Sequence, residues 1–191
     1  MIGRCFFCFA IVASTLWAAD DYTFWIDECT AEAANATGCQ SGDAELGRWA
    51  LEAWQRETNG GVKFTKSASE AHARIKLHWA NGAAHLYGET EPVVVDGKRG
   101  AVIYVLPEAR AADPLLRDAI VYLTCVHESG HALGLRHTDA FADIMYTFGN
   151  GGDIAEYFGR YRRLLKTRTD IAQHSGISPA DRIAIRAAFP N

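Results

Sequence analysis

The sequence lacks an apolar run long enough to cross a membrane. Its longest apolar stretch, residues 5–16, follows Arg4 and ends in small residues before Asp20. A membrane-spanning helix needs roughly 18 or more apolar residues, so this stretch is too short. A basic residue, a short apolar segment and small residues are typical of a secretory signal peptide. We therefore expect residues 1–19 to be removed, leaving a secreted, periplasmic or otherwise extracellular chain without a transmembrane segment.

Basic residues are too few to suggest a polyanionic partner. The chain has 19 lysines and arginines against 23 aspartates and glutamates, a net charge of −4 with neutral histidines. Loss of Arg4 with the signal peptide makes the mature chain more acidic. Because nucleic-acid binding relies on a basic surface, we expect no nucleic-acid partner. Internal repeats and low-complexity tracts are absent, so residues 20–191 are expected to form one domain, and we expect a monomer.

Cysteine is scarce once the signal peptide is set aside. Cys29, Cys39 and Cys125 remain in the mature chain. In an oxidising compartment Cys29 and Cys39 could close a small surface loop, and we expect this disulfide. Cys125 is interpreted as a buried free thiol that packs as a small hydrophobe, rather than as a metal ligand.

The pattern of apolar residues predicts an α+β domain. Alternating or β-branched segments indicate strands, and apolar residues at a period of 3.6 indicate helices. The expected strands are residues 22–26, 62–65, 73–79, 84–90 and 101–106. The expected helices are residues 43–58, 114–133 and 179–189, with a partly helical segment at 153–173 and a polar loop before residue 43. This order predicts a twisted, mixed and mostly parallel sheet of about five strands with three main helices packed against it.

Three histidines and one glutamate are clustered between residues 127 and 137. His127 and His131 are four residues apart, so on a helix they share one face and could bind one tetrahedral ion. Gly134 can adopt the positive φ that ends a helix, which lets the chain turn back and offer His137 as third ligand. Glu128 falls beside them and can take a proton from a metal-bound water. Three ligands leave a fourth position open.

The remaining histidines and the basic run at residues 160–168 have simpler interpretations. A single histidine is usually a surface or satisfied core residue, so we assign no role to four of them: His72, His78, His85 and His174. A basic run is most often a solvated helix face. The alternative for residues 160–168 is a subsite for acidic substrates or a contact with anionic surfaces.

The pattern His-Glu-x-x-His-x-x-Gly-x-x-His followed by a methionine resembles the signature of the metzincin zinc peptidases. Gly130 and Gly134 are the two glycines of this stretch, and Met145 lies eight residues after His137. Residues 143–146 resemble the turn that places a methionine beneath the zinc in the matrixin (matrix metalloproteinase) branch. Thr138 is similar to the serine that matrixins have there. The resemblance implies a metzincin-like fold with an active-site cleft across the domain, one catalytic Zn²⁺ and Glu128 as general base.

The chain departs from the matrixin pattern in several places. No zinc-blocking cysteine lies between the signal peptide and the first expected strand, and Thr147 stands where a proline is common. No histidine and aspartate cluster for a second, structural zinc is apparent, and nothing indicates calcium, so we expect one zinc. Residues 149–176 form a longer segment than the equivalent family loop and are expected to border the substrate pocket. By resemblance, residues 86–89 pair with substrate as an added strand.

Together these features predict a secreted zinc endopeptidase. Its partner would be a protein or peptide substrate, hydrolysed by a zinc-activated water with Glu128 as general base. The alternative is a catalytically weak or inactive zinc-binding module that recognises peptides or cell-surface polymers. The intact Glu128 counts against that alternative.

Overall fold

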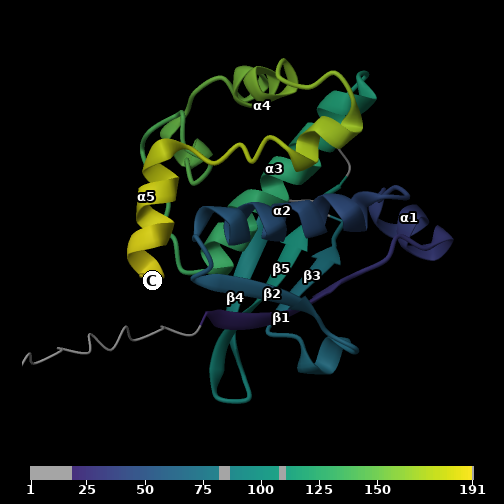
Figure 1. The fold of residues 1–191 in the computed structure, drawn as a ribbon. Coiled ribbons are helices and arrows are strands. Elements are labelled where there is room, and N and C mark those ends of the chain that lie inside the picture. Colours follow the sequence, from purple (N-terminus) through teal and green to yellow (C-terminus); the bar gives the residue numbers. More distant parts are fainter. Residues whose placement is uncertain (1–18, 82–86, 108–110, 191) are drawn as a thin grey trace, which may run out of the picture.

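The computed structural model describes residues 19–81, 87–107 and 111–190. In this part of the chain five strands and five α-helices form an α+β fold (Figure 1). The elements are β1 (Asp20–Ile26), α1 (Ala31–Thr37), α2 (Asp43–Glu57), β2 (Val62–Lys66), β3 (Ile75–Trp79), β4 (Gly88–Val95), β5 (Lys98–Val105), α3 (Pro114–Ala132), α4 (Ile154–Arg162) and α5 (Pro179–Ala188). Short 3-10 turns lie at Glu70–His72, Phe148–Asn150 and Arg168–Ala172.

The five strands form one sheet in the order β2-β1-β3-β5-β4. All neighbours are parallel except β4, which is antiparallel to β5 and lies at the edge. The β4–β5 hairpin turns at Asp96 and Gly97, which have φ of 51° and 72°. Positive φ at both central residues is typical of the two-residue hairpin turn, and Asp-Gly is a favoured pair there. The mostly parallel five-stranded sheet expected from the sequence is therefore confirmed.

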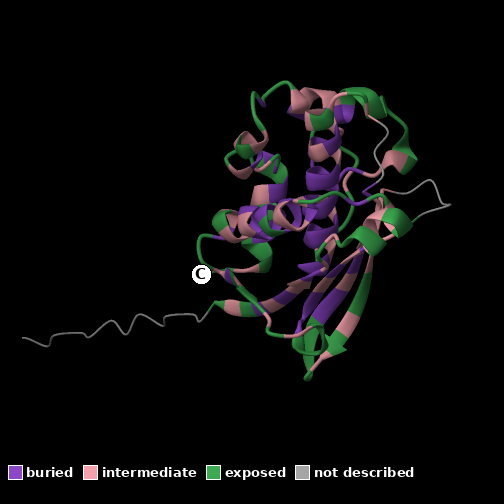
Figure 2. Cartoon of the chain, turned by 90° about the vertical axis from the view of Figure 1, so that its right-hand side faces the viewer, coloured by how far each residue is buried: buried purple, intermediate pink, exposed green. Residues whose placement is uncertain are grey.

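The core lies between the sheet and helices α2 and α3 (Figure 2). Successive residues of a strand face opposite sides, and in β3 the buried positions are Ile75, Leu77 and Trp79. The two helices contact each other as well as the sheet. Trp54 of α2 is fully buried, and its indole nitrogen donates a hydrogen bond of 2.8 Å to the Val126 carbonyl in α3. This contact holds the C-terminal half of α3, which carries the histidines, against α2.

One helix and several boundaries were not predicted. The segment expected to be a loop before residue 43 contains α1, which is capped by Thr30 and ends at Gly38 with φ of 77°. None of its residues is buried, so it lacks the apolar stripe by which helices are recognised. The strand expected at 84–90 begins at Gly88 and continues to Val95, while residues 84–86 lie outside the described residues. The expected signal peptide lies outside them too, apart from its last residue.

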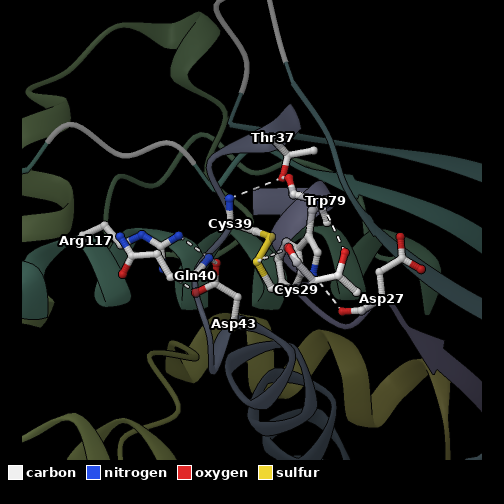
Figure 3. The surroundings of a disulfide bond; sticks show 10 residues. Asp27, Cys29, Thr37, Cys39, Gln40, Asp43, Trp79 and Arg117 are labelled. Carbon is white, nitrogen blue, oxygen red and sulfur yellow. Dashed lines mark hydrogen bonds and ion pairs between the residues drawn. A yellow bond between two sulfur atoms is a disulfide. The ribbon is translucent and has the colours of Figure 1, made fainter. Parts of the chain in front are cut away.

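A disulfide joins Cys29 to Cys39 and encloses α1 (Figure 3). The Cα atoms of these residues are 5.9 Å apart, within the range that the bond requires. The backbone amide of Gln40, next to Cys39, donates to the Asp43 carboxylate at 2.8 Å, so the loop leads directly into the start of α2. Cys125 is a free thiol buried in α3, as its sequence context suggested.

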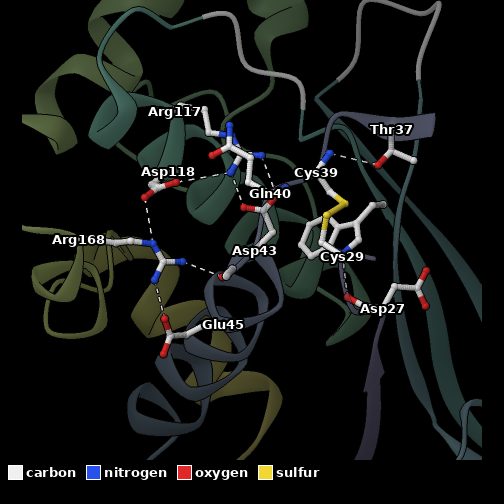
Figure 4. Close-up of polar contacts among 12 residues, drawn as sticks. Asp27, Cys29, Thr37, Cys39, Gln40, Asp43, Glu45, Arg117, Asp118 and Arg168 are labelled. Atoms are coloured by element: carbon white, nitrogen blue, oxygen red, sulfur yellow. Dashed lines mark hydrogen bonds and ion pairs between the residues drawn. A yellow bond between two sulfur atoms is a disulfide. The ribbon is translucent and has the colours of Figure 1, made fainter. Parts of the chain in front are cut away.

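Ion pairs connect α2, α3 and the turn at Arg168–Ala172 (Figure 4). Asp43 and Arg117 pair with side chains only 1% and 4% exposed. Arg168 pairs with Asp118 at 3.0 Å and with Glu45 at 2.5 Å.

The basic run is largely neutralised by ion pairs. Arg162 pairs with Asp113 at 2.7 Å and Arg163 with Glu156 at 2.5 Å, in addition to the Arg168 contacts. Only Arg163 is more than half exposed among these three arginines. The run therefore follows the solvated-face interpretation only in part.

None of the helices in the described part of the chain combines the length and the apolar character that crossing a membrane would require.

Candidate metal centre

Three imidazoles converge where α3 ends. His127 and His131 lie on one face of its last turns, and His137 returns to them after the helix. The Nε2 atom of His137 is 3.2 Å from that of His127 and 3.1 Å from that of His131. Two nitrogens bound at roughly 2.0–2.1 Å to one tetrahedral ion would lie about 3.3 Å apart. These spacings match that requirement closely, so the triad could hold one metal ion.

The chain turns at Gly134, as the motif requires. Gly134 has φ of 101°, in the left-handed region that glycine adopts without a steric penalty. Its amide donates to the His131 carbonyl at 2.9 Å, and the Leu135 amide donates to the Gly130 carbonyl at 2.9 Å. These two bonds satisfy carbonyls at the end of the helix. The turn sends the chain back so that His137 meets the other two rings.

Backbone carbonyls orient two of the rings. Nδ1 of His127 lies 2.6 Å from the Ile144 carbonyl oxygen, and Nδ1 of His131 lies 2.9 Å from that of Leu135. A carbonyl only accepts, so each Nδ1 carries the proton and each Nε2 offers its lone pair to a metal. Burial lowers the pKa of His127 to about 4 and also lowers the pKa of His131. Both rings are therefore neutral at pH 7, as metal ligands must be.

Met145 lies directly beneath the histidine helix. Its side chain is 1% exposed, and a Cβ placed on Gly130 would come within 2.5 Å of the Met145 sulfur. The Thr138 amide donates to the Met145 carbonyl at 2.9 Å. Thr138 and Tyr146 also form an isolated β-bridge. The segment after the third histidine is thereby paired with the methionine turn.

Two buried aspartates, Asp143 of the turn and Asp181 of α5, link the methionine turn to the start of α5. The Ile144 amide donates to Asp181 of α5 at 2.7 Å, and the Ser178 hydroxyl donates to Asp143 at 2.7 Å. The Tyr157 hydroxyl donates to the Asp143 carbonyl at 3.0 Å. Burial raises the pKa of Asp181. The helix expected from residue 179 is present as α5, but its link to the turn was not predicted, because Ile144 and Asp181 are 37 residues apart in the sequence.

Glu128 lies beside the triad with its carboxylate buried. The side-chain hydroxyl of Thr90 in β4 is 2.6 Å from Oε2 of Glu128. Burial raises the pKa of Glu128 to about 7, and the nearby Glu89 acts in the same direction while the Thr90 hydroxyl acts against it. A carboxyl group whose pKa lies near neutrality is suited to both accepting and returning a proton. Thr90 was not identified from the sequence, where nothing distinguishes it from other threonines on strands.

A cavity of about 360 Å³ opens beside the triad. Strand β4 and α3 form one side of it, and aromatic side chains line much of the rest: Tyr87, Tyr146, Phe148, Tyr157 and Phe158. Two of these, Tyr157 and Phe158, belong to α4 in the 149–176 segment, which therefore borders the pocket as expected. Thr147 also lines the cavity. The arrangement places a cavity lined by aromatic side chains next to the three histidines that could hold a metal ion.

The other described histidines do not join a comparable cluster. Among the residues that the structure describes, only His127, His131 and His137 form a group of three or more potential ligands. Nδ1 of His78 lies 2.9 Å from Asp27, on the face of the sheet away from the core. His85 lies outside the described residues.

Comparison of the chain with models of known protein families found no match, and comparison with curated proteins found none either. The function has to be inferred from the residues of the site and their geometry.

Proposed function

We propose that this protein is a secreted zinc-dependent endopeptidase of the metzincin class, similar to the matrixin catalytic domains. The observation that carries the proposal is the convergence of three imidazoles at tetrahedral spacing beside one buried glutamate. An all-imidazole set of three with a free fourth position is typical of catalytic rather than structural zinc. The motif and the methionine turn support the metzincin assignment.

The donor set fits zinc on chemical grounds. Neutral imidazole is a ligand that zinc binds well, and carbonyl groups behind two of the rings raise their basicity. His127, His131 and His137 would hold the ion. When bound in this way, zinc supplies the Lewis acidity that activates a water and polarises a peptide carbonyl.

Glu128 would carry the proton in the reaction. Its carboxylate accepts the proton of the attacking water and returns it to the departing amine of the cleaved peptide bond. In the metal-free site burial raises the pKa of Glu128 to about 7, so the group takes up a proton more readily than an exposed glutamate. Its burial also excludes bulk water from the base.

The surroundings of the site fit an extended peptide. Strand β4 is an edge strand, so one of its sides offers unpaired backbone groups to which a peptide could add as a further strand. The aromatic cavity would receive an apolar side chain of that peptide. A protein or peptide substrate follows from these two features.

The test is hydrolysis of casein or of a quenched peptide by the purified chain from residue 20 onward. Wild type is expected to cleave, and a zinc chelator is expected to abolish cleavage. Glu128→Gln keeps the size of the side chain but removes the base, so it should lower kcat by about 100- to 10,000-fold with zinc retained. Glu156→Gln, an exposed glutamate of α4, is the matched control and should cleave normally. An inert wild type with full zinc would instead favour a non-hydrolytic recognition module.

A further inference from the structure

We propose that Thr90 of the edge strand β4 is a positioning residue that fixes the Glu128 carboxylate, and that Gly88 provides the space in which this carboxylate lies. The inference rests on the proposed function, in which Glu128 is the base. It assigns to β4 a second task besides pairing with substrate.

The Thr90 hydroxyl lies between two acceptors of the same residue. It is 2.6 Å from the carboxylate Oε2 of Glu128 and 3.0 Å from the backbone carbonyl of Glu128. Because one hydroxyl contacts both its carboxylate and its backbone carbonyl, the Glu128 side chain has few rotamers left. Glu128 has three side-chain torsions and would otherwise sample several positions. The hydroxyl therefore selects one of them.

Gly88, two residues before Thr90, faces the same glutamate. A Cβ at Gly88 would lie 2.8 Å from Cγ of Glu128 and 3.0 Å from its Oε1. Contacts this short are repulsive, so any larger residue would displace the side chain. Residues two apart in a strand share a face. Gly88 therefore leaves room for Oε1 of the Glu128 carboxylate, and Thr90 donates a hydrogen bond to Oε2.

In the parts of the chain that are described, Thr90 is the only side chain that makes a hydrogen bond to the Glu128 carboxylate. Thr124 of α3 is also close to Gly88, but its hydroxyl donates to the Ile120 carbonyl of its own helix at 2.9 Å. Loss of the Thr90 hydroxyl would therefore leave the buried base without a fixed partner.

The chain contains a matched control for this contact. Thr65 is on β2, at the opposite edge of the sheet, and its hydroxyl donates to the carboxylate of Asp21 at 3.0 Å. Thr65→Val removes the same kind of hydrogen bond far from the cavity. Thr90→Val keeps the shape of the side chain without its hydroxyl, whereas Thr90→Ser keeps the hydroxyl.

The first experiment measures kcat, KM, zinc content and melting temperature for these variants. Thr90→Val is expected to lower kcat by about 10- to 100-fold, with KM, zinc content and melting temperature close to wild type. Thr90→Ser should stay within about threefold of wild type, as should Thr65→Val. Thr90→Ala replaces the valine variant if the latter does not fold. Equal losses in the valine and serine variants, or an unchanged kcat in the valine variant, would overturn the proposal.

A second readout does not depend on activity. Crystal structures of wild type, Thr90→Val and Thr90→Ser report where the Glu128 carboxylate lies. Displacement or multiple positions in the valine variant alone support the positioning role even if wild type proves inert, in which case only the proposed function fails. An unmoved carboxylate in the valine variant would overturn the positioning role even if wild type cleaves peptides.

Discussion

Gly130 is a point of close approach between the histidine helix and the methionine turn. An added Cβ would lie 2.5 Å from the Met145 sulfur and 3.1 Å from Trp54. Both neighbours are buried, so neither can move away without disturbing the core. This position therefore requires glycine for packing, although its backbone conformation is helical.

We predict that Gly130→Ala lowers the free energy of unfolding by about 1–3 kcal/mol through overpacking. Urea unfolding of the metal-free protein measures it. Gly159→Ala in α4 is the control, because its Cβ would meet only Arg163 at an ordinary 3.5 Å. That variant should be neutral or more stable by up to about 1 kcal/mol, since alanine favours helix over glycine. Equal effects at the two positions would contradict the packing account.

In the metal-free protein, His127 should contribute a loss of stability as the pH falls from about 6.5 to about 4. Burial lowers the pKa of His127 to about 4, whereas an unfolded histidine has a pKa of about 6.5. In that window the unfolded chain binds a proton that the folded chain does not, so the free energy of unfolding decreases with falling pH. Below about pH 4 both states are protonated and the dependence ends.

His127→Asn isolates this contribution. In urea unfolding of both chelator-treated proteins between pH 4 and 7.5, the free energy of unfolding of wild type relative to that of the variant should decrease as the pH falls. The contribution of Glu128, whose raised pKa acts in the opposite direction, is present in both proteins and cancels. Identical slopes would show that His127 is not held neutral by burial.

At the scale of elements, α1 packs only partly against the core, through Ala33 and Ala34, and is enclosed by a covalent link. None of its residues is buried, while Cys39 is 4% exposed at the end of its loop. The disulfide restricts the unfolded loop between Cys29 and Cys39. It also holds the segment that leads to Asp43 at the start of α2.

Replacing Cys29 and Cys39 together by serine should lower the free energy of unfolding by about 2–3 kcal/mol, as expected for a loop of this length. Thermal and urea unfolding measure the loss. Reduction of the wild-type disulfide should give a similar loss, because Cys125 is not involved. A serine variant as stable as the oxidised wild type would show that the loop is already ordered without the link.

Elements with a periodic apolar pattern were predictable, and those without one were not. The helix at 43–58 and the helix at 114–133 each differ from α2 and α3 by only one residue at the C-terminal end, because each has a continuous buried stripe. The helix α1 has no such stripe, and the second half of β4 is largely exposed. A segment that faces solvent has no periodic apolar pattern from which its structure could be predicted. For α1, the capping residue Thr30 is the sequence feature that indicates a helix.

At the scale of the whole molecule, one buried ion pair joins α2 to α3, the helix that carries His127 and His131. Asp43 begins α2 and Arg117 lies in the first turn of α3, and their side chains are almost completely buried. Asp118 also lies 3.5 Å from Arg117. Removing the Asp43 charge leaves a buried cation with only this weaker partner.

Asp43→Asn should therefore lower the free energy of unfolding by roughly 3 kcal/mol, near the lower end for a broken buried pair. Urea unfolding at neutral pH measures it. Glu156→Gln breaks the exposed pair with Arg163 and should leave the unfolding midpoint unchanged. A comparable loss from both variants would mean that burial does not decide the strength of these pairs.

The three candidate metal ligands could be predicted from the sequence, but the residues that support them could not. The helical spacing of His127 and His131 and the break at Gly134 are local properties of the chain. Thr90 and Asp181 reach the site from β4 and α5, through contacts between residues 38 and 37 positions apart. Such contacts depend on how the elements pack, which has no local signature in the sequence.

The central claim is that one metal ion is held by the three converging imidazoles. Metal analysis of the purified protein and of His137→Ala tests it most directly. We predict about one equivalent of zinc per chain in wild type and at least a tenfold weaker affinity in the variant, since one of three ligands is lost. A wild type without stoichiometric metal, or a variant that retains zinc as tightly as wild type, would contradict the account.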